Sequence, residues 1–266
     1  MNAEVPQALS CSEELSLRAL SRLPHIRPGD DLAALIDAAL RAEQLPLHDC
    51  DVLVVCSKIV AKAEDRYLDL STVQPSARAL ELAAQSGKDA RLVEAILQES
   101  SHVSRVARDV LVVRHKTGHV SANAGFDQSN VPPRAGTGPW VLRLPADPDG
   151  SAERLRAQLS AVWKVRLGVV ISDSFGRPFR QGTVGAAIGC AGLPPLFDQR
   201  GRLDMFGRRL EHTLSATADQ LAAAADLVAG QADEARPVVR VRGLSFAPSD
   251  AGASVLCRAP AEDLYL

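Results

Sequence analysis

An apolar run passes directly into a polar segment in the sequence Gly168-Val-Val-Ile-Ser-Asp-Ser-Phe-Gly-Arg-Pro-Phe-Arg-Gln-Gly-Thr183. The β-branched residues Val169–Ile171 predict a short buried strand. In open α/β sheets, ligands bind just beyond the carboxyl ends of such strands. We therefore expect an α/β fold in which Asp173 and Ser174 lie on a loop at the ligand-binding edge of a sheet.

The side chains of this segment suit phosphoryl chemistry. Carboxylate and hydroxyl oxygens, such as those of Asp173 and Ser174, are hard ligands for a divalent cation. The guanidinium groups of Arg177 and Arg180 match phosphate or carboxylate, and Gly182 lets backbone N–H groups approach an anion. An ordinary strand-to-loop exit is the alternative, because Asp, Ser and Gly are also common turn residues.

The segment 108–130 adds a second polar loop. It predicts a strand that turns near Lys116–Gly118 and then returns into a loop rich in Asn, Gly and Asp. Asp127 offers a carboxylate to a metal ion, and Asn130 offers an amide that can donate to and accept from a nucleotide or phosphate. A hairpin followed by an Asx turn without a ligand would explain the same residues.

The composition is that of an ordinary globular protein. The 266 residues are 46% hydrophobic and 23% charged, and the formal net charge is -2. The chain has no excess of positive charge that would favour nonspecific binding to nucleic acid or a membrane, so we expect small-molecule ligands. The five cysteines are scattered without a Cys-x-x-Cys pair, which argues against a disulfide framework and a structural zinc site. The N-terminus carries no export signal, so we expect a cytoplasmic protein.

Helical and extended patterns alternate along the chain. Strands are predicted at 51–56 and 237–242, and the proline- and glycine-rich segment 131–148 is predicted to be a loop. The helices are predicted at about 31–43, from Ser76 to Leu97 with a break at Gly87, from Asp147 with Leu155, Leu159 and Val162 on one face, and at about 215–230. The pattern indicates one α/β (α+β) domain, 1–266, of two lobes with a mixed sheet in the main lobe.

Two common nucleotide-binding signatures are missing from the sequence. There is no Gly-x-x-x-x-Gly-Lys-Ser/Thr loop, and no Gly-x-Gly-x-x-Gly segment follows a predicted strand. We therefore expect neither a P-loop nor a Rossmann site.

Several motifs occur in the order typical of one family. They are Leu23-Pro-x-Ile26, Ser57-Lys-Ile-Val-x-Lys62, Ser121-Ala-Asn-Ala-Gly-x-Asp-x-Ser-Asn130, Ile171-Ser-Asp-Ser-Phe-Gly-Arg-Pro-x-Arg-x-Gly182, Arg200-Gly-x-x-Asp-x-Phe-Gly-Arg208 and Leu227-Val-x-Gly-Gln231. On these motifs, the chain from about Leu23 to Phe246 resembles the coenzyme F-420-0:L-glutamate ligases.

The resemblance implies a ligase that uses GTP to attach L-glutamate to the lactyl phosphate tail of a deazaflavin coenzyme, F-420-0. The γ-phosphoryl group would pass to the coenzyme carboxylate, and the glutamate amine would then displace it, leaving GDP and phosphate. The same chemistry would add further γ-linked glutamates. Two divalent cations, Mg²⁺ or Mn²⁺, would serve the reaction, with K⁺ as an additional ion. The resemblance also implies a homodimer. Some relatives carry a second, nitroreductase-like domain, which we do not expect here because the sequence ends at Leu266.

The resemblance also implies roles for individual residues. The guanine nucleotide would contact Leu23, Pro24, His25, Ile26, Ser57, Lys62 and Asn130. The divalent cations would be held by Asp127, Asp173, Ser174 and Gln231. Charge on the transferring group would be neutralised by Lys62, Arg177 and Arg180. Serine at position 174 supplies the same hydroxyl oxygen as the threonine that is common there.

The residues alone leave other functions open. Asp127, Asn130, Asp173 and Gln231 would also suit a two-metal phosphoesterase that activates water. Most such sites recruit histidine, and none of the six histidines lies in the segment around Asp173. A non-catalytic nucleotide-binding regulator is a further alternative. Glutamate-dependent consumption of GTP would separate the ligase from both.

Overall fold

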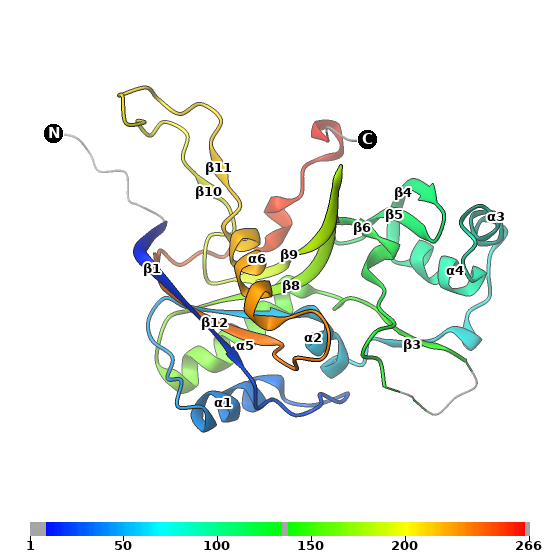
Figure 1. Ribbon diagram of the computed structural model, residues 1–266, viewed down its shortest axis with the longest axis horizontal. Coiled ribbons are helices and arrows are strands. Elements are labelled where there is room, and N and C mark those ends of the chain that lie inside the picture. The colour runs from blue at the N-terminus through cyan, green and yellow to red at the C-terminus, as the bar shows by residue number, and fades with distance from the viewer. Residues whose placement is uncertain (1–8, 133, 135–137, 264–266) are drawn as a thin grey trace.

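The computed structural model describes residues 9–132, 134 and 138–263. Its main sheet has the strand order β1 (Leu9–Leu20), β12 (Val238–Phe246), β2 (Asp51–Cys56), β8 (Leu167–Arg177) and β9 (Arg180–Ala191). β2 and β8 are parallel, and the other neighbouring strands are antiparallel. The expected α/β fold with a mixed sheet is confirmed (Figure 1).

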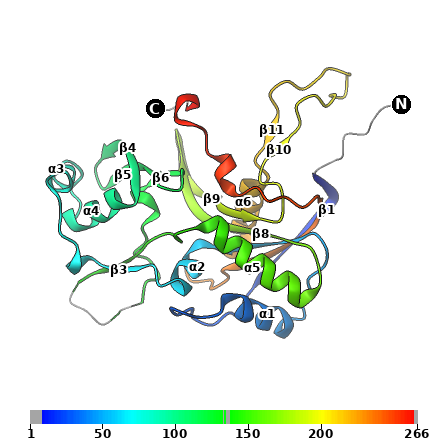
Figure 2. The ribbon, with the colours of Figure 1, turned by 180° about the vertical axis from the view of Figure 1, so that it is seen from behind.

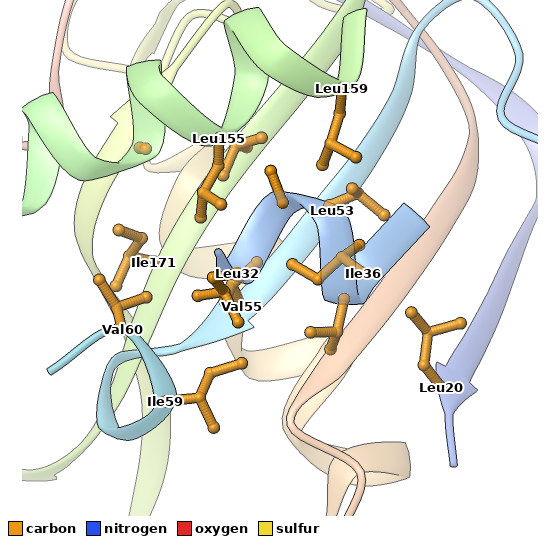
Figure 3. Close-up of a cluster of buried hydrophobic side chains, with 14 of the residues drawn as sticks. Leu20, Leu32, Ile36, Leu53, Val55, Ile59, Val60, Leu155, Leu159 and Ile171 are labelled. Atoms are coloured by element: carbon orange, nitrogen blue, oxygen red, sulfur yellow. The ribbon is translucent and has the colours of Figure 1, made fainter. Parts of the chain in front are cut away.

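Helices cover both faces of this sheet because its central strands are apolar on both sides. On β2, Leu53 and Val55 pack in one cluster with α1 and α5, and Val52 and Val54 pack in another with α6. Alternate residues of a strand point to opposite faces, so the two clusters together fix the register of β2. Figure 3 shows the first cluster. The helices are α1 (Leu32–Ala42), α5 (Pro148–Trp163) and α6 (Thr217–Ala229).

A second, smaller sheet lies beside the main one (Figures 1 and 2). Two helices pack on it and form an apolar cluster that includes Leu82, Ile96 and Leu111. Its elements are α3 (Ala77–Ser86), α4 (Ala90–Gln98), β4 (Ser100–Ala107), β5 (Val110–His115) and β6 (Val120–Ala122). The remaining elements are α2 (Ser57–Ala63), the paired strands β3 (Tyr67–Asp69) and β7 (Trp140–Leu142), and the 3-10 helices η1 (Leu70–Thr72), η2 (Asn123–Gly125), η3 (Ala253–Leu256) and η4 (Pro260–Glu262). Among the described helices, none is long and apolar enough to cross a bilayer.

Local sequence signals place most helix boundaries correctly. The side chains of Asp31, Ser76 and Asp147 each accept a hydrogen bond from a backbone N–H in the first turn of α1, α3 and α5. Such N-caps satisfy donors that the helix itself leaves free. Gly87 ends α3 with a positive φ of 74°, which glycine adopts without steric cost.

Two expectations about local structure are wrong. Asp173 lies within β8 and not on a loop, because β8 continues beyond the apolar core as an antiparallel hairpin with β9. The segment 131–148 contains β7, whose backbone pairs with β3, and its last residue begins α5. Leu155, Leu159 and Val162 do lie within α5 as expected; the first two are buried in the apolar cluster, whereas Val162 near the end of the helix is 52% exposed.

The segment 197–215 leaves the body of the molecule as an arm (Figures 1 and 2). The strands β10 (Phe197–Asp198) and β11 (Leu214–Ser215) pair at its base. Further out, Met205 and Phe206 are 93% and 92% exposed. Exposed apolar side chains grouped on a protruding segment are typical of an interaction surface.

The glycines of β9 allow helices to pack closely on the sheet. A Cβ atom at Gly189 would lie 2.4 Å from the carbonyl oxygen of Pro148 on α5, and one at Gly185 would lie 2.4 Å from that of Ala222 on α6. Because both obstacles are backbone atoms, a side chain at either position forces a helix away from the sheet. Glycine at these positions therefore sets the distance between β9 and its two helices.

We expect Gly189→Ala to lower the free energy of unfolding by about 1–3 kcal/mol, the usual cost of overpacking a core. Gly176→Ala is the matched control, because it lies on the same hairpin with no atom within 4 Å of the added Cβ. It should change the free energy by less than about 0.5 kcal/mol. Urea unfolding followed by circular dichroism measures both, and equal midpoints for the two variants would contradict the close packing of α5 on β9.

Candidate functional site

Two carboxylates meet where β8 leaves the apolar core. α2 begins directly after β2, beside the point where β2 and β8 pair in parallel. Ser57, the first residue of α2, donates a hydrogen bond from Oγ to Asp173 Oδ1 at 2.9 Å. Asp127 and Asp173 line one small cleft, together with Ser57 and Lys58. The sequence therefore brings these residues together from three separate segments.

The Asp127 carboxylate is fixed by its own loop and by a lysine. Its backbone exchanges two hydrogen bonds with Leu142, and Oδ1 accepts from the N–H and the hydroxyl of Ser129. The Lys58 ammonium lies 2.5 Å from Oδ2 and also donates to Ser129 Oγ at 3.0 Å. Asp127 thus already contacts one cation, and its geometry is set by hydrogen bonds before any ligand binds.

The electrostatic environment of Asp173 disfavours a lone negative charge. Burial raises its pKa to about 6, and the nearby Asp127 carboxylate acts in the same direction. Hydrogen bonds from the Ser57 hydroxyl and the Ser174 backbone N–H oppose this shift without cancelling it. A cation bound between Asp127 and Asp173 would stabilise the charged form of Asp173. It would offset the cost of removing that carboxylate from water and its repulsion from the Asp127 carboxylate.

A second pair of predicted ligands lies on the opposite face of β8. Ser174 follows Asp173 along the strand, so its side chain points the other way, toward the segment after α6. Its Oγ donates to Gln231 Oε1 at 2.9 Å. The four predicted metal ligands therefore form two pairs, Asp127 with Asp173 and Ser174 with Gln231. All four offer oxygen atoms, which suit Mg²⁺ or Mn²⁺.

Lys62 and Asn130 lie next to the Asp127 loop. The Lys62 ammonium donates to the Asn130 carbonyl oxygen at 2.8 Å, and the Asn130 amide donates to the Ala232 carbonyl oxygen at 3.1 Å. Burial lowers the pKa of Lys62, and the neighbouring Lys58 charge adds to this effect. An anion bound at this position would stabilise the charged form of Lys62 and raise its pKa again.

The segment Leu23–Ile26 lies near α2 without contacting the carboxylates. Ile26 is buried in the cluster that contains Ile59 and Val60 of α2, while Pro24 and His25 are exposed. The Gly29 N–H donates to the carbonyl oxygen of Ala63 at the end of α2. The chain just after the predicted nucleotide-contacting segment is therefore bonded to the end of α2 that carries Lys62.

The predicted arginines are placed apart from the two carboxylates. Arg177 ends β8 and donates from Nη2 to the Gln181 carbonyl oxygen at 3.0 Å, and Arg180 is exposed at the start of β9. Within the described part of the chain, neither guanidinium bonds to Asp127 or Asp173. Extended backbone rises about 3.3 Å per residue, so Arg177 is roughly 13 Å along the strand from Asp173.

Sequence reasoning missed three residues that shape the site. Lys58 stands beside Ser57 in a quoted motif, and Ser129 lies within the Asp127 loop, so both were close to predicted ligands. Asp226, which accepts a hydrogen bond from Gln231 Nε2, lies within an alanine-rich helix and carries no such signal. Only the folded chain brings its carboxylate to Gln231.

Comparison with known proteins shows the family of this chain. The family model described as F420-0:Gamma-glutamyl ligase matches residues 21–243. The chain belongs to this family. The match spans every predicted site residue, from Leu23 to Gln231.

Several relatives in the F420-0:gamma-glutamyl ligase family are similar over nearly their full length. A protein of Methanothermobacter thermautotrophicus named Coenzyme F420:L-glutamate ligase is 46% identical over 94% of this chain and 98% of its own. A protein of the same name from Methanopyrus kandleri is 45% identical over 90% and 93% of the two chains. Another from Archaeoglobus fulgidus is 46% identical over 85% and 86%.

We expect Asp173→Asn to stabilise the metal-free protein at pH 7. Because the native pKa of Asp173 is raised, the native state keeps a proton that the unfolded state releases between about pH 4 and 6. Wild-type stability therefore falls as pH rises through this window. The neutral amide of Asp173→Asn does not titrate, so the variant keeps its stability over this range. Its free energy of unfolding should exceed that of wild type by about 1–3 kcal/mol at pH 7, with no difference near pH 4.

Urea unfolding in EDTA at pH 4 and pH 7 measures this difference. Asp109→Asn is a control, because the Asp109 side chain is 77% exposed and its substitution should leave the wild-type pH dependence unchanged. An Asp173→Asn variant that is less stable than wild type at pH 7 would show that the carboxylate is not destabilised by burial.

Proposed function

We propose that the protein is a GTP-dependent ligase that attaches L-glutamate to coenzyme F-420-0 and then adds further γ-linked glutamates, with release of GDP and phosphate. The proposal is carried by the 46% identity, over 94% of the chain, to a protein named Coenzyme F420:L-glutamate ligase. The family match includes the carboxylates, the lysines and the Ser174–Gln231 pair. We also propose that the enzyme acts in the cytoplasm, where GTP and glutamate are present.

The proposed reaction activates a carboxylate that would not otherwise condense with an amine in water. The γ-phosphoryl group of GTP is transferred to a carboxylate oxygen of the coenzyme, which gives an acyl phosphate and GDP. The glutamate amine attacks the carbonyl carbon, the C–N bond forms, and the C–O bond to phosphate breaks. Because all reactants are anionic, the protein's main tasks are to position them and to neutralise their charge.

We propose two divalent cations, Mg²⁺ or Mn²⁺, one for each oxygen pair. The fit is supported by the partly buried Asp173 carboxylate, whose pKa is raised beside Asp127, and by the Gln231 amide oxygen that faces the Ser174 hydroxyl. When bound, such cations neutralise phosphoryl oxygens and the charge that develops on them. K⁺ as an additional ion is a proposal that rests on the family resemblance alone.

The nucleotide is proposed to lie along α2, between the segment Leu23–Ile26 and the Asp127 loop. Ser57 and Lys62 would meet its polar groups from α2, and Asn130 would approach from the loop. The hydrogen bond between Lys62 and the Asn130 carbonyl supports this arrangement, because it holds both groups at one place. Arg177 and Arg180 would neutralise substrate charge from the end of the β8–β9 hairpin.

We further propose that the protein is a homodimer. The arm 197–215 supports an interface, since Met205 and Phe206 on it are almost fully exposed. A two-stranded ribbon is marginally stable alone in water, and burial against a second copy would stabilise it.

Lys62→Ala is expected to raise the apparent KM for GTP by about one to two decades, because a charge-assisted hydrogen bond to phosphate is worth roughly 1.5–3 kcal/mol. The KM for glutamate should change little. Lys116→Ala, an exposed residue of the smaller sheet, serves as the control and should leave both values unchanged. Steady-state assays of GDP release measure them, and an unchanged GTP titration would show that Lys62 does not contact the nucleotide.

The mechanism is tested with coenzyme precursor that carries ¹⁸O in its carboxylate. On the acyl-phosphate route, one labelled oxygen leaves with inorganic phosphate for each amide formed, and phosphate release requires glutamate. A two-metal phosphoesterase would take its new oxygen from solvent and would release phosphate without glutamate. Mass spectrometry of the phosphate decides between them, and unlabelled phosphate would reject the ligase mechanism.

A further inference from the structure

The side-chain amide of Gln231 is held from both ends. Its Oε1 accepts from Ser174 Oγ at 2.9 Å, and its Nε2 donates to Asp226 Oδ1. An amide presents an acceptor at one end and two donors at the other, so its orientation decides what it offers to a ligand. A cation binds the oxygen and is repelled by the NH₂ group. The partner of Nε2 therefore matters as much as Gln231 itself.

Asp226 reaches Gln231 because of how α6 lies on β9. The helix packs closely at Gly185, which is opposite Ser174 in the β8–β9 ladder. The Gly185 backbone N–H donates to the Asp226 carboxylate, which fixes that side chain over the edge strand. The chain then turns at Gly230, where φ is 78°, and brings Gln231 back beside the last turns of the helix.

We propose that Asp226 is a positioning residue that keeps Oε1 of Gln231 turned toward Ser174, ready to bind the second cation. The inference rests on the proposed function, because that function supplies the cation. A carboxylate has only acceptor atoms, so Asp226 can accept from both the Gly185 N–H and Gln231 Nε2. It cannot donate to Gln231, and the reversed amide would place two acceptor oxygens against each other. Asp226 thus excludes the orientation that would present NH₂ to the cation.

The test measures the binding of Mn²⁺ to the full chain by electron paramagnetic resonance and calorimetry, in the presence and absence of GDP. Wild-type protein should bind two Mn²⁺ ions. Asp226→Asn replaces one acceptor oxygen with an NH₂ group, which lets the Gln231 amide reverse. Loss of such an outer-shell partner usually weakens metal binding by about 10- to 100-fold. We expect this loss for one ion, while the ion at Asp127 and Asp173 keeps its affinity.

Two further variants distinguish positioning from a structural role. Asp219→Asn is the matched control, since Asp219 also lies on α6 and accepts from a β9 N–H, that of Ala187, seven residues before Asp226. It should leave both Mn²⁺ affinities unchanged. The double variant Asp226→Asn with Gln231→Glu exchanges the donor and the acceptor. The amide introduced at position 226 can donate to one oxygen of the carboxylate introduced at position 231, and the other oxygen of that carboxylate faces Ser174. It should recover most of the lost affinity.

The outcomes separate this inference from the proposed function. If wild-type protein binds two ions and Asp226→Asn binds them equally well, the positioning role is wrong while the ligase proposal stands. An equal loss at both ions, or no recovery in the double variant, would also overturn it. Wild-type protein that binds no Mn²⁺ in either condition would overturn the cation sites and this inference together.

Discussion

The alternation of side chains along β8 is the constraint on which the site depends. Within the core, Val169 and Ile171 pack on the face of α5 while Val170 packs on the face of α6. β8 continues as one strand to Arg177, so its side chains keep alternating between the two faces of the sheet. Asp173 therefore points to the same face as Ile171, and Ser174 points to the same face as Val170. A slip of one residue would bring Arg166 or Ser172 into the cluster with α5 and exchange the faces of Asp173 and Ser174. Core packing thus determines which oxygen faces which partner.

The apolar residues and helix caps could be predicted from sequence because they depend on local chemistry. Asp31 and Ser76 bond to backbone only three residues away, and a period of 3.6 marks the buried face of α1. The polar half of β8 has a sequence typical of a loop, because Asp, Ser and Gly are common turn residues. Its strand structure comes from pairing with β9, which a pattern of polar residues does not reveal. The resemblance to a family indicates which residues form the site. That they form two separate pairs follows only from the structure, in which β8 extends through both Asp173 and Ser174.

Most contacts between distant segments could not be predicted from local sequence patterns. Lys58 and Asp127 are far apart in sequence, and Asn130 contacts Ala232, which is 102 residues further along the chain. Each contact follows from how the smaller sheet and α6 dock on the main sheet. A sequence pattern indicates which residues suit a metal or a phosphate, whereas docking decides which of them share it.

The segment after α6 connects the two halves of the site. Gln231 faces the Ser174 hydroxyl, and the carbonyl oxygen of the next residue, Ala232, accepts from the Asn130 amide. Asn130 in turn accepts from Lys62 on α2. The proposed nucleotide side of the site and the second oxygen pair are therefore linked through two adjacent residues beyond Gly230. In the proposed reaction, which brings three anions together, such a link would help to assemble both halves of the site.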